Sequence, residues 1–510
     1  MAVERAGDGE RGIGGGGMNA IGTARMDGET TRREGRMERV GARRFAGFGG
    51  VSFGYDVAVV GGALGALAKD LNMNSGERGA AVGAAKFGAA MGAFGGAAAM
   101  RCFGRTRAAV MIVGTCSTVG AIACWAFVEA SRSVAGFALG RIVLGVPVGA
   151  LAVIVPAYTG ESVDASSRGA VGASYELSVC AGMILANALT WFKPSKSLGL
   201  VLVSPIVLGF WSSIAFATCP ESARWLLGRG DVEGARDALR ASGRDENAVD
   251  AEIETLRAEV DDIDDAGFGK SLVDSVVGGM REAMEGEEYR AVRIALALAL
   301  FNQLNASTSI INYSPRVLRN IVQAKGGTTS PSGEFDAFNL YTGLIVLCKT
   351  AGVAASIIYV DKFGRRPLLI LGSVAAGSGL TFACFGYAVN SFAVTLVGMC
   401  AFILAYSVSF ASVFWVLVSE FFSMRTKSAC TALVTATLFV SGAISDLIFP
   451  VLLASTGAFT FAVYASMCFA SALFVHVYVP ETARLSLREV QALLGRKPSA
   501  YARVELGQMY

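Results

Sequence analysis

Apolar residues are gathered in long runs that short polar segments separate. Each run has about 20 residues, which is the length that an α-helix needs to cross the hydrocarbon core of a bilayer. We count twelve runs, near 46–68, 80–100, 108–128, 134–156, 170–192, 198–218, 292–318, 337–360, 367–389, 393–419, 428–453 and 457–479. The pattern predicts an all-α membrane protein with twelve transmembrane helices.

Composition and charge support this class. Of the 510 residues, 53% are hydrophobic and only 17% are charged, whereas soluble domains carry about a quarter charged residues. The net charge of +3 is too small to suggest a nucleic-acid partner. Lys and Arg crowd the N-terminal tail and the short loops around 101–107 and 362–366. The positive-inside rule therefore predicts that both termini and the long segment 219–290 are cytosolic.

Several classes of function are disfavoured. The ten cysteines lie mostly inside the apolar runs without paired spacing, and His476 is the only histidine. This pattern predicts no disulfide framework and no metal site. No nucleophile–base pair or phosphate-binding loop stands out, so we expect neither an enzyme nor a cofactor.

The polar segments divide the chain into five parts. Residues 1–45 are rich in Gly, Arg and Glu and lack the apolar stretch of a signal peptide, so we expect a disordered cytosolic tail. A plastid address remains an alternative, although the many acids in this tail argue against it. Six-helix bundles are expected over 46–218 and 291–479, a cytosolic loop with short helices over 219–290, and a cytosolic tail over 480–510.

The two halves repeat each other. "CFGRTR" at 102–107 matches "KFGRRP" at 362–367, and "PESAR" at 220–224 matches "PETAR" at 480–484, both at an offset of 260 residues. Glu161 and Glu420 lie 259 residues apart. Three echoes at nearly one offset indicate a duplicated six-helix unit, with a binding site expected between the halves at the midplane.

These stretches, with "FGYD" (53–56), "GR" (140–141), "PAYTGE" (156–161), "NQL" (302–304), "NYSP" (312–315) and "FWVLVSE" (414–420), resemble the sugar porter family of the major facilitator superfamily. The resemblance covers about residues 46–490. It implies a secondary active transporter that works by alternating access. In this family, Arg and acidic residues at the cytosolic helix ends form a gate of ion pairs, and the matching positions here are Arg101, Arg105, Glu161, Arg168, Asp361, Arg365, Glu420 and Arg425. The family's acid before the first "R-x-G-R" is Met100 here, which makes the gate less symmetric.

Asp56 lies in the middle of the first apolar run. A charge near the bilayer centre costs roughly 2.5–3.5 kcal/mol on insertion scales, so it normally faces the interior of the bundle and has a partner. In proton-coupled members of the family, the Asp of "FGYD" titrates and the Arg of "GR" is its partner, which implies proton coupling through Asp56 and Arg141. The alternative is a permanent Asp–Arg strut.

The resemblance also implies a solute cavity. Its residues here would be Glu176, Asn302, Gln303, Thr308, Lys349 and Trp415. Glu176 and Lys349 replace amides of the family, and the prolines that usually precede Trp415 are absent from "SFASVFW". Three interpretations stay open: a mutual ion pair, a cavity for a charged solute, or a neutral sugar held by charge-assisted hydrogen bonds. Lys86 and Asp446 are two further polar groups inside apolar runs, and we expect them to line the water-filled path or lie near its ends.

We therefore expect a proton symporter for a sugar or related polyhydroxylated solute. A carrier of an organic anion or sugar acid, and a non-transporting nutrient sensor on the same fold, are the alternatives. The expected partners are the solute, protons and the lipid bilayer, without nucleic acid, and the expected state is a monomer. The plasma membrane is the first expectation, with a plastid or vacuolar membrane as alternatives.

Overall fold

The structure is a computed structural model of the chain, and it describes residues 16–163, 165–191, 198–242, 246–264, 272–286, 288–326, 337–423, 426–483, 485 and 487–494. The described residues are almost all helical. The long helices are α1 (Gly16–Asp70), α2 (Ser75–Phe103), α3 (Arg105–Glu129), α4 (Val134–Ser162), α5 (Ala165–Trp191), α6 (Leu198–Ala217), α11 (Tyr289–Leu304), α12 (Ser307–Ala324), α13 (Ala337–Phe363), α14 (Arg365–Ala388), α15 (Phe392–Tyr406), α16 (Ser412–Phe421), α17 (Lys427–Thr456) and α18 (Phe459–Tyr478).

These helices account for all twelve predicted spans. Two spans are each built from consecutive helices: α11 with α12, and α15 with α16, which the π-helical turn η1 (Ser407–Ala411) joins. By length and hydropathy, ten spans of the described residues could cross a membrane, and only α2 and α5 fall short. In α2 the cause is its many glycines together with Lys86, which lower the mean hydropathy of the span. The predicted fold class, a twelve-helix major facilitator fold, is confirmed.

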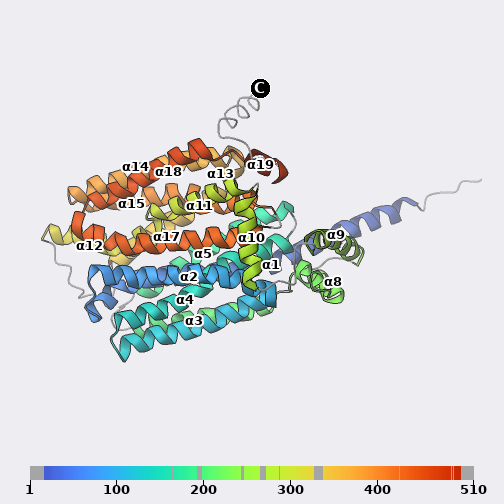
Figure 1. Ribbon diagram of the computed structural model, residues 1–510, viewed down its shortest axis with the longest axis horizontal. Helices are drawn as coiled ribbons and strands as arrows, with labels where there is room; N and C mark the ends of the chain where they lie inside the picture. Colours follow the sequence, from blue (N-terminus) through green and yellow to red (C-terminus); the bar gives the residue numbers. More distant parts are fainter. Residues whose placement is uncertain are drawn as a thin grey trace, which may run out of the picture.

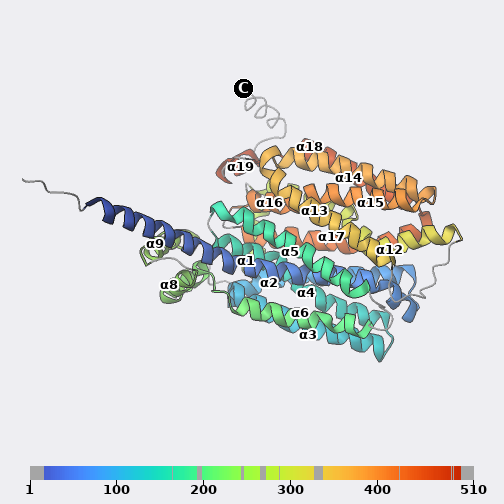
Figure 2. The same cartoon turned by 180° about the vertical axis from the view of Figure 1, so that it is seen from behind.

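The spans form two bundles that lie side by side (Figures 1 and 2). α1 to α6 make up the N-terminal half, and α11 to α18 make up the C-terminal half. Four shorter helices connect the halves, α7 (Ala223–Leu227), α8 (Val232–Ala241), α9 (Glu246–Asp264) and α10 (Leu272–Glu285). We call the end of the bundles beside α8 and α9 the near end, and the opposite end the far end. The helix α19 (Leu487–Leu494) also lies at the near end.

The N-terminal tail differs from the expectation of disorder over 1–45. α1 begins at Gly16, and the ring of Phe45 is fully buried, with its centroid 4.2 Å from that of Tyr158 and 4.6 Å from that of Phe216. The charged residues before the apolar run therefore belong to a helix that enters the core one turn earlier than the hydropathy pattern indicated.

The duplicated motifs fold into duplicated turns. Gly104 between α2 and α3 and Gly364 between α13 and α14 both have positive φ angles, 93° and 85°. Next to each glycine lies a carboxylate, because Glu221 accepts the Arg105 amide at 2.7 Å and Glu481 accepts the Arg365 amide at 2.9 Å. A Cβ on Gly104 would lie only 2.3 Å from Glu221 Oε2. Glycine is thus required twice over, by the backbone conformation and by the close approach of the acid.

Two helices are irregular near the middle of the bundle. The break between α11 and α12 contains Ala306 in the left-handed conformation (φ 62°), and the Ser307 amide donates to Asn305 Oδ1 at 3.2 Å. The π-helical turn η1 occupies the stretch where the family's prolines are missing. In contrast, α4 is continuous through Pro147. Broken helices and π-turns often mark functional sites in transporters.

The halves contact each other closely toward the far end. α2 of one half packs against α17 of the other. The Asn339 side chain donates to the Gly62 and Thr190 carbonyls of the opposite half at 3.2 and 3.1 Å, and the Tyr313 hydroxyl donates to the Arg78 carbonyl at 3.1 Å. In this arrangement hydrogen bonds hold the halves together at the far end.

Candidate functional site

A cavity lies between the two halves, beside both irregular helices. Its empty space, including the part that is open to solvent, amounts to about 770 Å³. All six residues predicted for solute binding line it: Glu176, Asn302, Gln303, Thr308, Lys349 and Trp415. They come from α5 in one half and from α11, α12, α13 and α16 in the other.

The amides of α11 are already ordered. Asn302 donates to the Phe410 carbonyl of η1 at 3.3 Å and accepts from the Tyr406 hydroxyl at 2.9 Å. Gln303 Nε2 donates to Asn302 Oδ1 at 3.1 Å. The π-turn therefore has a direct role here, since it presents the Phe410 carbonyl to Asn302. These bonds orient the amides without using all of their hydrogen-bonding capacity.

Glu176 and Lys349 face the same cavity from opposite halves. Both belong to the described part of the chain, and their charged atoms do not come within the 4.0 Å of an ion pair, although each affects the other electrostatically. The mutual ion pair considered from the sequence is thus not formed in this arrangement. Each charge is left to interact with what enters the cavity.

Aromatic side chains form part of the cavity wall. Trp415 packs edge-on against Phe414, with ring centroids 5.1 Å apart, and Phe53 and Phe439 approach each other from opposite halves with centroids 6.1 Å apart. Such faces suit the C–H surfaces of a cyclic polyol. Phe439 is the aromatic residue that α17 contributes to the cavity wall.

Lys86 also lines the cavity, and it forms an ion pair with Asp446 across the two halves, with Nζ and Oδ2 2.8 Å apart. From the sequence, each residue was noticeable only as a polar group inside an apolar run. Their pairing could not be predicted, because the two lie 360 residues apart and neither belongs to the repeated motifs.

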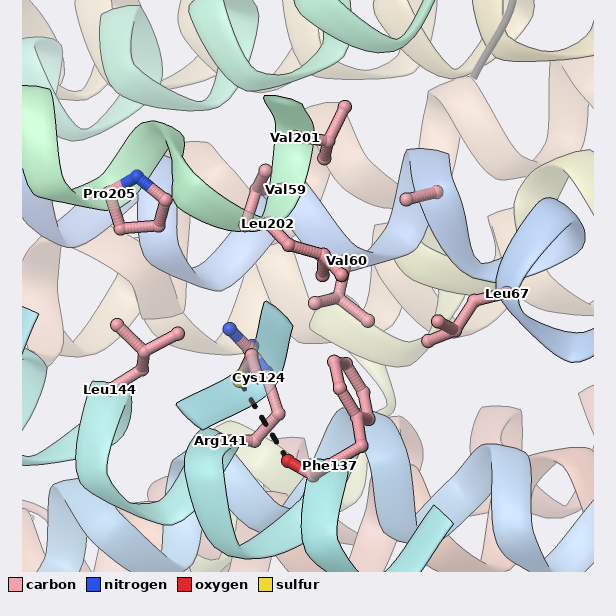
Figure 3. A pocket seen from close by; sticks show the side chains of 11 residues that line it. Val59, Val60, Leu67, Cys124, Phe137, Arg141, Leu144, Val201, Leu202 and Pro205 are labelled. Atoms are coloured by element: carbon pink, nitrogen blue, oxygen red, sulfur yellow. Dashed lines mark hydrogen bonds between the residues drawn. The ribbon is translucent and has the colours of Figure 1, made fainter. Parts of the chain in front are cut away.

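Asp56 and Arg141 are both buried and are adjacent. Their contact is not a carboxylate–guanidinium pair: Arg141 Nη2 donates to the backbone carbonyl of Asp56 at 3.2 Å. Two guanidinium nitrogens, Nε and Nη1, have no hydrogen-bond partner. Figure 3 shows Arg141 beside Cys124 in a pocket whose other walls are apolar, namely Val59, Val60, Ala63, Leu67, Phe137, Leu144, Val201, Leu202 and Pro205.

The predicted gate residues meet within each half at the near end. Arg105 pairs with Glu161 at 2.6 Å, and Arg365 pairs with Glu420 at 3.2 Å. The carbonyl of Arg101 accepts from the Trp225 indole at 2.9 Å. The side chains of Arg168 and Asp361, and Arg425 as a whole, lie outside the described residues.

Two acids of this region were missed as site residues. These acids are Glu221 and Glu481, which accept from the amides of Arg105 and Arg365. A hydroxyl group also donates to the acid of each ion pair: Ser222 donates to Glu161, and Thr482 donates to Glu420 at 2.6 Å. The signal was present in the repeated "PESAR" and "PETAR", which contain both the acid and the hydroxyl residue. The repeat indicates duplication, but it does not by itself show which side chains meet in the folded turns.

Two helical bundles around a central polar cavity, with two broken spans beside it, are typical of membrane transporters. The sequence profile of the family described as "Sugar (and other) transporter" matches residues 44–494. The chain belongs to this family, so the resemblance predicted from its motifs is confirmed.

Individual relatives agree with the family. The chain is 28% identical to a probable metabolite transport protein, CsbC, of Bacillus subtilis, over 89% of this chain and 94% of the relative. It is 29% identical to the major myo-inositol transporter IolT of the same organism, over 87% and 92%. Among solved structures, the proton:xylose symporter XylE shares the fold with a TM-score of 0.72 at 23% identity, over 89% of this chain and 99% of that one.

Proposed function

We propose that this protein is a proton symporter for a sugar or a cyclic polyol. The observation that carries the proposal is the cavity between the halves, in which the Asn302 and Gln303 amides lie opposite aromatic walls. A ring with many hydroxyl groups can donate to and accept from such amides while its C–H face packs on Trp415. The names of two relatives, transporters of myo-inositol and of xylose, point to the same class of solute.

Proton coupling is proposed for Asp56. A buried carboxylate that lies beside Arg141 without a direct ion pair can exchange its proton when the halves move, because a small shift of the guanidinium changes which charge state is favoured. The unpaired Arg141 nitrogens are the groups that would take up the carboxylate in the other state. A permanent strut would instead require the direct pair.

The second candidate is a carrier of sugar acids or related anions. It is favoured by Lys349, which is buried and faces the cavity without an ion pair to Glu176. A carboxylate on the solute would supply that partner. Glu176 works against a simple anion, since it places a negative charge in the same cavity, so a neutral polyol with charge-assisted hydrogen bonds is our first choice.

We further propose that one chain is the working unit, since the cavity is built from a single chain. We place the near end, with α8 to α10, in the cytosol because of the arginine-rich loops there. The plasma membrane is the proposed location. In this orientation the contacts between the halves at the far end would close the cavity from the outer side of the membrane.

Uptake by the purified chain in proteoliposomes tests this function. We expect accumulation of myo-inositol or a neutral aldose when the side facing the far end is acidic, and little accumulation without a pH gradient. Uptake of glucuronate or another sugar acid in preference to all neutral solutes would favour the second candidate. Absence of transport and of binding for the whole panel would contradict both.

A further inference from the structure

Lys86 and Asp446 form a buried ion pair that connects the two halves. The side chains are 8% and 0% exposed, and Asp446 is additionally held by Ser309, whose hydroxyl donates to Oδ1 at 2.6 Å. Buried charges are normally tolerated only when they are paired and hydrogen-bonded. This pair therefore forms a strong constraint on how the halves can be arranged.

The pair lies on the tightest seam between the halves. Along α2, the residues one and two turns before Lys86 are Gly83 and Gly79. A Cβ on Gly79 would lie 2.6 Å from the Leu447 carbonyl, and a Cβ on Gly83 would lie 2.9 Å from the Ala443 carbonyl. α2 and α17 are thus in backbone contact on the far-end side of the pair. Any motion that opens the far end by separating these helices must also pull on the ion pair.

The same ammonium group reaches the cavity. Lys86 Nζ donates to Thr308 Oγ1, and it lies 3.4 Å from Gln303 Oε1 and 3.3 Å from the Gly442 carbonyl. These three acceptors match the three N–H donors of an ammonium, so Asp446 Oδ2 is paired with Lys86 by charge but accepts no hydrogen bond. A solute hydroxyl that takes over Gln303 Oε1 would free one N–H of Lys86, which could then donate to Asp446 Oδ2. The Lys86 ammonium therefore takes part both in the cavity and in the ion pair, so a solute in the cavity can affect the pair.

We propose that the Lys86–Asp446 pair is a latch between the halves, and that it stabilises the arrangement closed at the far end. Lys86 is the residue that links this latch to the cavity. When α2 and α17 separate, both charges lose their main partner in a poorly solvated region, and this cost opposes opening. The inference requires that the halves move, as in any member of the family, but it does not depend on which solute is carried.

The test measures the arrangement of the halves without any solute. Labels attached through unnatural amino acids at Lys69 on α1 and Ser455 on α17, both exposed near the far end, report the distance between the halves by pulsed spin resonance. The main variant is the double substitution Lys86→Met with Asp446→Leu, which removes the latch and leaves no unpaired buried charge. We expect the ratio of far-end-open to far-end-closed molecules to rise at least tenfold.

Two further variants separate a latch from a merely structural role. Asp446→Glu keeps the charge and should retain most of the closed population. Asp70→Asn neutralises an exposed acid at the same end, whose ion pair with Arg132 is long at 3.7 Å, and should leave the distances unchanged. An unchanged distance distribution in the double variant would overturn the proposal. So would an equal shift in Asp446→Glu, since that would mean that packing and not charge holds the seam.

Discussion

The charged residues at the near end are repeated in the two halves, whereas those near the middle of the bundle are not. At the near end each arrangement is present twice, since Arg105 and Glu161 in one half correspond to Arg365 and Glu420 in the other. In the middle the charges occur once. At the offset of 260 residues, Arg141 is matched by Ala401.

This difference separates two tasks. An ion pair that joins neighbouring helix ends within one half stabilises the other half in the same way, because both bundles have the same helix–turn–helix geometry. A proton site or a solute contact is needed once per transport cycle, so duplication would add a second buried charge without a partner. We therefore expect substitutions in the middle to change what is transported and how, and substitutions at the near end to change stability equally in the two halves.

The largest effect is expected for Asp56→Asn. The substitution keeps the shape of the side chain but removes the group that can lose a proton. Accumulation of solute driven by a pH gradient should fall to background, whereas exchange of labelled for unlabelled solute across the membrane should persist. Both are measured in proteoliposomes.

Asp70→Asn is the matched control, since it makes the same chemical change on the same helix at an exposed position. It should leave accumulation at the wild-type level. Concentration of solute by the Asp56→Asn chain in response to a pH gradient would show that Asp56 and Arg141 form a structural strut and do not couple transport to protons.

An intermediate effect is expected at the two cavity charges. Glu176→Gln and Lys349→Asn each replace a charge-assisted hydrogen bond to solute by a neutral one. Hydrogen bonds to charged groups contribute about 1.5–3 kcal/mol and neutral ones about 0.5–1.5 kcal/mol, so a loss of about 1–1.5 kcal/mol should raise the KM for the preferred solute roughly 5- to 10-fold. The double variant restores the amides of the family, and its preference should move toward neutral hexoses.

The two single variants and the double also measure whether the charges act together. Because no ion pair joins them, we expect the losses to add within about 0.5 kcal/mol, which uptake kinetics can resolve. A double variant that is much less impaired than either single one would reveal a direct pair in another state of the cycle. Glu129→Gln, an exposed acid at the end of α3, serves as the control.

The smallest effect is expected at the duplicated turns. Glu221→Gln and Glu481→Gln remove a negative charge from the N-terminal ends of α3 and α14, where it is stabilised by free amides and the helix dipole. Each should lower the free energy of unfolding by about 1–2 kcal/mol, and the two values should agree. Thermal unfolding of the purified variants measures this, with exposed Glu233→Gln in the first turn of α8 as control. Clearly unequal losses of unfolding free energy in the two variants would show that the two turns are not energetically equivalent.

Much of the architecture could be predicted from the sequence. The hydropathy runs located all twelve spans, because a bilayer imposes a length and a polarity on each helix independently of its neighbours. The repeated motifs indicated the duplication, and the structure places Gly104 and Gly364 in equivalent turns. All six residues predicted for the cavity line it, since their roles were carried over position by position from a family with the same fold.

Other features depend on contacts between segments far apart in the chain, and these only the tertiary structure decided. Hydropathy cannot show that α12 begins after a left-handed Ala306, or that η1 forms a π-turn without prolines, in which the Phe410 carbonyl accepts from Asn302 of another helix. It also cannot pair Lys86 with Asp446. A single charge in an apolar run demands a partner, but which residue supplies that partner is settled by how closely the two halves pack along the glycines of α2.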